Sequence, residues 1–161
     1  MAETRIRGAA RQDIPLILSL VRELAEYERL SHEVVATEDT LRESLFGERR
    51  YAEVLIAEHD ATPAGFALFF HNFSTFLGKP GIYLEDLYVR PVFRGAGIFK
   101  NLLVHLARLA KRRDCGRLEC WVLDWNEPSI GFYKKLGAVP MDDWTVYRVT
   151  GEALEDLASG A

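Results

Sequence analysis

The sequence predicts an α/β fold, because strand patterns and helix patterns follow one another along a chain of single-domain length. The chain has 161 residues, 48% of them hydrophobic, which is enough for one domain over residues 1–161 with a sizeable core. Residues 82–89 are rich in aliphatic and aromatic side chains and precede Pro91, as expected of a strand that ends there. From Ile98 the apolar residues recur at the spacing of one helical face, which predicts a helix from about Gly97 to Arg113.

The elements that precede this strand and helix are two helices and three strands. Residues 4–8 form a short candidate strand. Asp13 is the candidate N-cap of a helix that runs to about Tyr27, and Thr37 is expected to open a second helix that ends near Leu45. Residues 52–58 and 64–71 have strand composition and flank a turn at 60–63, which predicts an antiparallel pair.

The elements that follow are shorter. A strand is expected at residues 117–123, and a short helix then has Pro128 in its first turn and ends at Gly137. Residues 144–149 predict a last strand. No repeat, linker or low-complexity segment interrupts this order.

The composition argues against several classes of partner. A net charge of −4 disfavours nucleic acid. The longest apolar stretch, residues 64–70, is far too short to span a bilayer, and no apolar run follows the charged N-terminus, so a cytoplasmic protein without a membrane partner is expected. No metal site is predicted, because none of the cysteines or histidines has metal-ligand spacing: Cys115, Cys120, His32, His59, His71 and His105.

The charges are nevertheless unevenly distributed along the chain. Residues 90–117 hold eight basic side chains and one acidic side chain, whereas residues 23–60 hold eleven acidic and four basic ones. The basic segment surrounds the turn between the central strand and its helix, and the acidic segment could attract a cationic substrate. Solvated helix faces account for most of these charges.

The turn Arg94-Gly95-Ala96-Gly97, called the glycine turn below, has the composition of an anion site. Two glycines permit backbone angles that other residues avoid, and the first amides of the following helix have no intrahelical partner. Such a turn binds anions, and the guanidinium of Arg94 suits a pyrophosphate. A dinucleotide fold would require glycine where this chain has Lys100, and the Gly-Lys-Ser/Thr ending of a P-loop is absent. The alternative is an ordinary turn before an amphipathic helix.

The order of arginine and glycines in this turn resembles the coenzyme A pyrophosphate loop of the GNAT superfamily of N-acetyltransferases. Residues 123–137, with Asn126 before a helix and Tyr133 within it, resemble the second GNAT motif. The resemblance covers nearly the whole chain and extends to the spermidine/spermine acetyltransferase branch and its thialysine acetyltransferase relatives. It is carried by Arg22–Glu28, Tyr83–Asp86, Arg94–Ile98 and Trp125–Lys134, while Ser74–Phe76 and Leu123–Asn126 look more like the thialysine form.

The resemblance implies a mixed, mostly antiparallel sheet of about six to seven strands with helices on both faces. It also implies acetyl-CoA as co-substrate, bound where two central strands part, and a homodimer. The GNAT pattern has Gly or Ala at position 99, where this chain has Phe99, although the backbone amide there can still donate. The residues implied to bind acetyl-CoA are Leu87, Val89, Arg94, Gly95, Ala96, Gly97, Ile98, Phe99, Asn126, Ser129, Tyr133 and Lys134.

The resemblance also implies how the chemistry is divided. An alkyl amine must lose a proton before it attacks a thioester, and Glu85 is the implied base, acting through water. A phenol can protonate the departing thiolate, so Tyr133 is the implied acid. Regular pleating would direct only one of Glu85 and Asp86 to the site, whereas a bulge would direct both. The residues implied to bind the amine are Tyr27, Glu28, Glu85, Asp86 and Trp144.

The sequence thus favours an acetyl-CoA-dependent N-acetyltransferase whose acceptor is a primary amine of a small cationic molecule. Diamines, polyamines and lysine-like amino acids such as thialysine belong to that class. Two alternatives remain open at this point: a protein N-acetyltransferase, and a non-catalytic coenzyme A-binding regulator. Phe99 is the departure that favours the regulator, and the retained Glu85 and Tyr133 oppose it.

Overall fold

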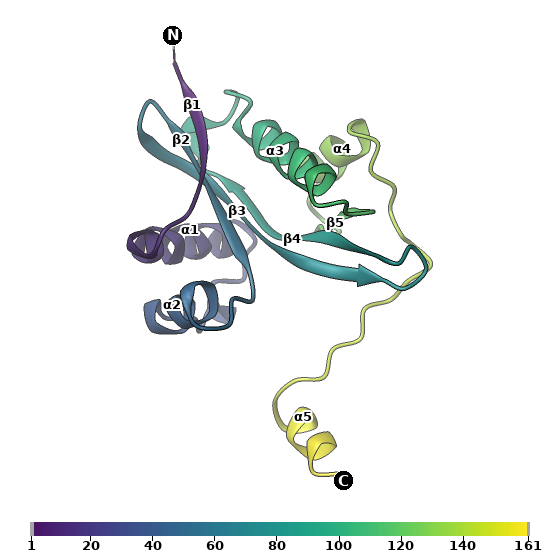
Figure 1. Cartoon of the computed structure of the whole chain (residues 1–161). Coiled ribbons are helices and arrows are strands. Elements are labelled where there is room, and N and C mark those ends of the chain that lie inside the picture. Colours follow the sequence, from purple (N-terminus) through teal and green to yellow (C-terminus); the bar gives the residue numbers. More distant parts are fainter. Residues whose placement is uncertain (1, 161) are drawn as a thin grey trace. The chain divides into compact units, whose positions relative to one another are not determined.

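In the computed structural model, which describes residues 2–160, a first unit ends at Trp121 and a second begins at Val122. The first unit is built on a five-stranded sheet in the order β1-β2-β3-β4-β5 (Figure 1). The first four strands are antiparallel neighbours and β5 is parallel to β4, which confirms a mixed, mostly antiparallel sheet. Residues 2–160 contain five strands rather than the six to seven expected: β1 Thr4–Gly8, β2 Glu53–His59, β3 Thr62–Ser74, β4 Lys79–Val89 and β5 Leu118–Cys120.

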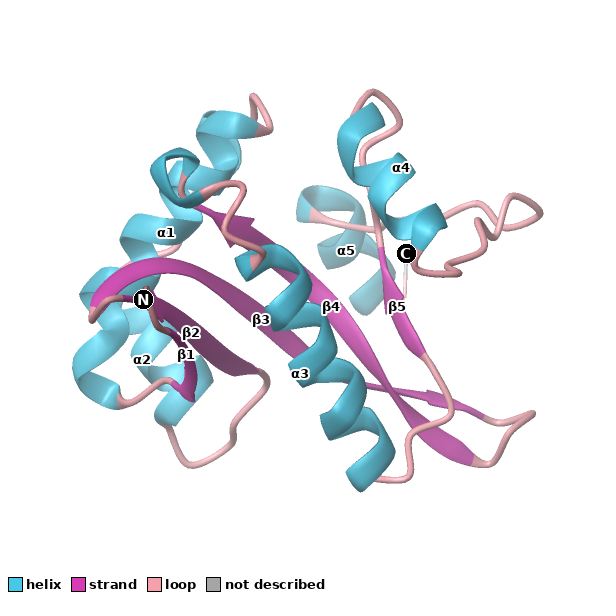
Figure 2. Cartoon of the chain, turned by 90° about the horizontal axis from the view of Figure 1, so that it is seen from above, coloured by secondary structure: helices cyan, strands magenta, loops and turns pink. Residues whose placement is uncertain are grey.

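Helices cover both faces of this sheet, as predicted. Helices α1 (Ile14–Tyr27) and α2 (Glu38–Phe46) lie on one face, and α3 (Ile98–Arg112) lies on the other (Figures 1 and 2). The apolar residues of α1 and α2 pack with alternate residues of the strands, among them Ile56 and Phe66. The buried face of α3 contributes Ile98, Leu102, Leu103, Leu106 and Ala110. The alternation of strand side chains therefore divides the core into two layers.

The predicted hairpin and the predicted start of α2 are confirmed. Strands β2 and β3 turn at Asp60 and Ala61, both of which have positive φ. Thr37 is the N-cap of α2, and its hydroxyl accepts a hydrogen bond from the amide of Thr40 at 3.2 Å. This bond satisfies one of the amides that a helix start leaves without a partner.

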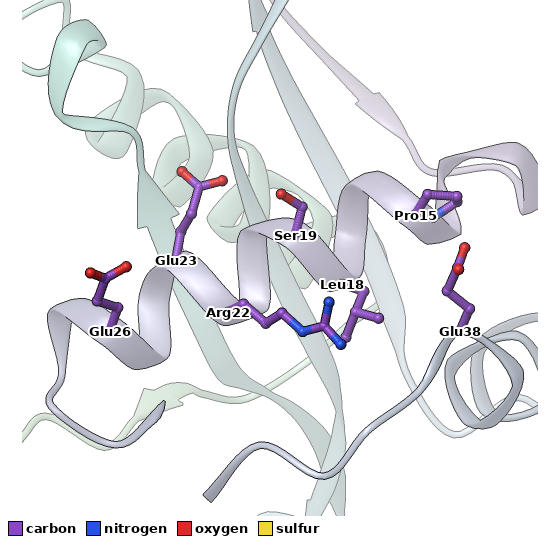
Figure 3. Close-up of a pocket in the computed structure, with 7 residues that line it drawn as sticks. All are labelled: Pro15, Leu18, Ser19, Arg22, Glu23, Glu26 and Glu38. Carbon is purple, nitrogen blue, oxygen red and sulfur yellow. The ribbon is translucent and has the colours of Figure 1, made fainter. Parts of the chain in front are cut away.

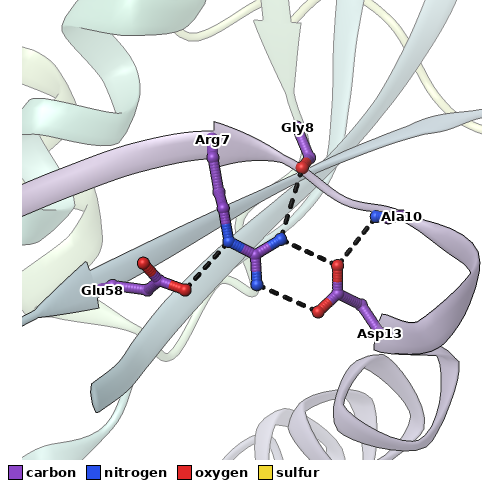
Figure 4. Close-up of polar contacts among 5 residues, drawn as sticks. All are labelled: Arg7, Gly8, Ala10, Asp13 and Glu58. Atoms are coloured by element: carbon purple, nitrogen blue, oxygen red, sulfur yellow. Dashed lines mark hydrogen bonds and ion pairs between the residues drawn. The ribbon is translucent and has the colours of Figure 1, made fainter. Parts of the chain in front are cut away.

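Asp13 is the N-cap of α1, as predicted, but its side chain does not cap the helix. Its carboxylate makes no capping bond to α1 and instead accepts bonds from the Ala10 amide at 2.7 Å and from the Arg7 guanidinium at 2.8 and 2.9 Å (Figure 4). Arg7 also donates to Glu58 of β2 at 2.9 Å. Asp13 is 7% exposed, and the hydrogen bonds from Arg7 lower the pKa of its carboxyl group. Through Arg7, Asp13 therefore connects the start of α1 with β1 and β2.

The second unit contains α4 (Glu127–Lys135) and α5 (Gly151–Ala158). The prediction for α4 is confirmed, with Pro128 in its first turn and Gly137 at positive φ just beyond its end. The prediction of a last strand at residues 144–149 is wrong, because that segment joins no ladder, and α5 was not predicted. None of the helices within residues 2–160 is long and apolar enough to cross a membrane.

We predict that Asp13→Asn lowers the free energy of unfolding by about 1.5–3 kcal/mol at pH 7, the range for a hydrogen bond to a charged group. Because the folded-state pKa of Asp13 is lowered, its contribution is complete above the unfolded pKa of about 3.9 and is lost as pH falls through the folded pKa. Urea unfolding at several pH values measures the difference.

The matched control is Asp39→Asn, which removes a pair with Arg42 at 2.8 Å whose carboxylate is 93% exposed. This substitution should have a far smaller effect, because exposed ion pairs contribute little. Equal losses for the two variants would show that Asp13 has no special role.

Candidate active site

The strand β4 carries a bulge at Glu85. Along the β3–β4 ladder, Phe69 is opposite Leu84 and the next residue of β3, Leu68, is opposite Asp86, so Glu85 is the extra residue on β4. Neighbouring residues of a regular strand point to opposite faces, and a bulge changes that alternation locally. The sequence did not decide between regular pleating and a bulge at Glu85 and Asp86. The structure has the bulge, and Glu85 is its extra residue.

The third carboxylate, Glu28, is held by the end of α1. Glu28 is the C-cap, and the chain then turns through Arg29, which has a φ of 62°. The amide of Leu30 donates to the carbonyl of Ala25 at 2.8 Å, as in the Schellman motif that commonly ends helices. Glycine usually occupies the left-handed position, so Arg29 holds a strained conformation directly after Glu28.

Glu28, Glu85 and Asp86, called the acidic cluster below, interact through their charges. Burial, then the charges of Glu85 and Glu28, raise the pKa of Asp86 to about 7. Burial, then the charge of Glu85, raise the pKa of Glu28. Glu85 itself is exposed. Because like charges oppose one another's ionisation, these carboxylates are suited to bind a cationic ligand or to accept a proton.

Two backbone amides beyond the bulge point away from β3. The Arg90 amide donates to the carbonyl of Ala64 at 2.8 Å. Because donation alternates along an antiparallel strand, the amides of Leu87 and Val89 are directed to the opposite side. On that side β5 pairs with β4 only from Ile82 to Leu84. The amides of Leu87 and Val89, on the same strand as Glu85 and Asp86, are therefore donors that the ladder with β3 does not use.

The glycine turn has the backbone geometry that the sequence predicts. Gly95 and Gly97 have φ values of 88° and 76°, and Gly97 is the N-cap of α3. Ile98 is buried in the core and Phe99 is half-buried. The first amides of α3 follow the turn directly, which is the arrangement that binds phosphate groups at helix N-termini.

One face of α1 contacts the segment that leads into this turn. The carboxylate of Glu23 accepts bonds from Arg90 Nε at 3.1 Å and Nη2 at 2.9 Å. Four residues later, the ring of Tyr27 lies 5.2 Å from the guanidinium carbon of Arg94. Sequence reasoning assigned no role to Glu23 or Arg90. The sequence feature that could have indicated this pairing is the spacing: Glu23 and Tyr27 are four residues apart, as are Arg90 and Arg94.

A separate cavity of about 300 Å³ lies along the first two helices (Figure 3). In Figure 3 the side chain of Glu38, the first residue of α2, reaches toward Pro15, and Glu23 and Glu26 extend from the other end of α1. None of the predicted site residues lines this cavity. Its lining residues are Pro15, Leu18, Ser19, Arg22, Glu23, Glu26 and Glu38.

The remaining predicted residues belong to the second unit. Asn126 is the N-cap of α4, and its side-chain oxygen accepts from the amide of Ser129 at 3.4 Å. Tyr133 lies in the last turns of α4, with its ring centroid 6.1 Å from that of Phe132, and Lys134 follows it. Trp144 lies in the segment between α4 and α5, where its amide donates to the carbonyl of Met141.

Comparisons with known proteins agree with the fold and the motifs. The sequence profile described as Acetyltransferase (GNAT) family matches residues 18–138. Thialysine N-epsilon-acetyltransferase of Mus musculus is 38% identical over 98% of this chain and 99% of its own length. L-ornithine N5-acetyltransferase NATA1 of Arabidopsis thaliana is 34% identical over 96% of this chain and 87% of its own.

Among solved structures, an integron cassette protein from the mobile metagenome of V. cholerae has a TM-score of 0.80 and 28% identity. The match covers 96% of this chain and 97% of that one. The resemblance stated from the sequence is thereby confirmed for the family and for its thialysine branch. On the family match and these identities, the chain belongs to the GNAT family of N-acetyltransferases.

Proposed function

We propose that this N-acetyltransferase moves an acetyl group from acetyl-CoA to a primary amine on a small cationic substrate. The observation that carries the proposal is the acidic cluster, in which the bulge at Glu85 and the end of α1 gather three carboxylates. A cluster of that charge is stabilised by a bound ammonium group. The named relatives act on thialysine and L-ornithine, which supports a lysine-like amino acid as acceptor, with diamines and polyamines in the same class.

Deprotonation of the amine is the step that requires the cluster. With a pKa near 10.4, about one alkyl amine in 2,500 is neutral at pH 7, a handicap of about 4.6 kcal/mol. Glu85, exposed on the bulge, takes this proton through water as the amine nitrogen attacks the thioester carbon. Glu28 and Asp86 hold the cation, and Tyr27 and Trp144 are the further residues predicted on the amine side.

The thioester carbonyl and the leaving sulfur need partners of their own. The amides of Leu87 and Val89 donate to the carbonyl oxygen as negative charge develops on it, and their direction away from β3 supports that role. As the carbon–sulfur bond breaks, Tyr133 gives its phenolic proton to the thiolate. The nitrogen loses two protons in all, one from the ammonium group before attack and one as the amide forms. One of them replaces the proton that Tyr133 gives to the sulfur, and the other is released to solvent.

The glycine turn is the proposed pyrophosphate site. Amides from Gly95 to Phe99 donate to the phosphate oxygens, and Arg94 adds a positive charge. Asn126, Ser129 and Lys134 are the proposed contacts from the second unit. The family profile matches residues in both units, which supports the proposal that residues 1–161 act as one acetyltransferase domain.

The direct test is release of free coenzyme A thiol from acetyl-CoA in the presence of thialysine, L-ornithine, spermidine or an unblocked peptide. Turnover with the small amines and not with the peptide is expected. Turnover confined to the peptide would indicate a protein N-acetyltransferase. Binding of acetyl-CoA without turnover on any acceptor would indicate a regulator.

The resemblance also implies a homodimer, and the shortness of the apolar stretches predicts a cytoplasmic location. Light scattering on the purified chain measures the oligomeric state, and a monomer at micromolar concentration would oppose the dimer. Fractionation of the source cells tests the location.

We predict that Glu85→Gln lowers kcat/KM by roughly 10²–10⁴ at neutral pH, the range for losing a general base. Activity should partly recover at high pH, where the amine loses its proton unaided. Glu28→Gln is the comparison, and it should raise KM with kcat nearly unchanged, because it removes attraction felt equally before and during reaction. If Glu85→Gln kept the wild-type pH–rate profile, Glu85 would not be the base, and water or Asp86 would have that role.

We predict that Asp86→Asn raises the melting temperature of the free enzyme at pH 8 and not at pH 4. The raised pKa of Asp86 means that the folded state binds this proton more tightly than the unfolded state does, so wild-type stability falls as pH rises from about 3.9 to about 7. The variant lacks that loss. Melting curves that stay parallel over this pH range would contradict the burial of a charge at Asp86.

We predict that Arg94→Ala weakens acetyl-CoA binding by about 1.5–3 kcal/mol, the scale of a lost charged hydrogen bond. Isothermal titration calorimetry measures the change. The control is Arg42→Ala, which removes an exposed arginine of α2 and should leave the affinity unaltered. Unchanged affinity for Arg94→Ala would remove the pyrophosphate assignment.

A further inference from the structure

Two arginines beyond β4 are held by one face of α1, in different ways. Glu23 and Tyr27 are four residues apart on α1 and so lie on the same side of the helix. Arg90 is bound by Glu23, and Arg94 lies with its guanidinium carbon 5.2 Å from the ring centroid of Tyr27. The two contacts fix both ends of the segment that joins β4 to the glycine turn.

The two arginines differ in what remains available for a ligand. Arg90 donates to both carboxylate oxygens of Glu23, and its Nη1 donates to the carbonyl of Pro63 at 3.1 Å. Its charge is thereby compensated, and each of its three nitrogens donates within the protein. Arg94 contacts a neutral ring, which attracts the positive charge without neutralising it. The guanidinium of Arg94 can therefore still bind an anion, through its charge and through bidentate hydrogen bonds.

We propose that Tyr27 is a positioning residue for the cofactor site: its ring holds the Arg94 guanidinium in place for the pyrophosphate of acetyl-CoA. This inference rests on the proposed function. Holding a long side chain before binding reduces the freedom that it loses when the ligand arrives, and so strengthens binding. Tyr27 then acts on the cofactor side, whereas the sequence placed it on the amine side.

The phenol hydroxyl is not required for this role, because the interaction involves the face of the ring. Tyr27→Phe should therefore keep wild-type affinity for acetyl-CoA, and Tyr27→Leu should weaken it about two- to fivefold, the range for a cation–π contact at an exposed site. Tyr27 is 38% exposed, so leucine there is compatible with folding. Calorimetry gives the dissociation constant, and initial rates give KM for acetyl-CoA and for the amine separately.

The chain offers a matched control. Tyr51, on the loop before β2, has the guanidinium carbon of Arg49 at 5.1 Å from its ring centroid. Tyr51→Leu removes an equivalent contact far along the chain from the glycine turn, and it should leave the affinity for acetyl-CoA unchanged.

A double-mutant cycle tests whether Tyr27 acts through Arg94. In the Arg94→Ala background, Tyr27→Leu should cause no further loss of affinity. An equal loss with and without Arg94 would overturn the proposal, as would tighter binding by Tyr27→Leu, or a changed KM for the amine alone. If wild type itself fails to bind acetyl-CoA, the proposed function and this inference both fail. If wild type binds and Tyr27→Leu binds equally well, only this inference fails.

Discussion

The structure depends on the way β4 is paired. On one side it is bonded to β3 along its whole length, and on the other it meets β5 over three residues, Ile82 to Leu84. The bulge at Glu85 follows at once, and the amides of Leu87 and Val89 are directed to the side that β5 has left. A fully paired strand would use those amides in its own ladder. The incomplete pairing of one central strand is thus what makes donors available for a ligand.

The surroundings of the acidic cluster disfavour the charged form of two of its carboxylates. Burial and the charge of Glu85 both oppose ionisation of Asp86 and Glu28, and they raise the pKa values of these two groups. A surface chosen for stability alone would disperse such charges. Elsewhere in the chain, carboxylates are paired with an arginine, as Asp13 and Glu58 are with Arg7. The grouping of like charges is therefore a local feature of the acidic cluster.

Local patterns predicted local structure well. The positive φ of Gly95 and Gly97, the cap at Thr37 and the helix after Asn126 follow from residues close in sequence. The differences lie where partners outside the element decide. Asp13 is the N-cap of α1, as predicted, but Arg7 of β1 and the Ala10 amide bind its carboxylate, so its side chain does not cap the helix. Residues 144–149 alternate like a strand, yet a strand exists only where a neighbour completes its hydrogen bonds.

The site shows the same division between local and distant information. Glu85 and Asp86 were predicted as site residues from the sequence, but the bulge that changes their directions depends on the register with β3. Glu23 and Arg90 were overlooked because neither has a distinctive neighbour in sequence, and their contact joins residues 67 positions apart. Helix α5 was not predicted, and the predicted strand at residues 144–149 ends directly before its N-cap, Thr150.

The matched four-residue spacing of Glu23 with Tyr27 and of Arg90 with Arg94 restricts how this chain can change in length. One residue inserted between Glu23 and Tyr27 would turn the second about 100° around the axis of α1, away from the side that Glu23 occupies. A deletion between Arg90 and Arg94 would shorten the link to the glycine turn while Glu23 still held its start. Insertions and deletions among related enzymes should therefore avoid residues 24–26 and 91–93, and should gather in the loops between the other elements.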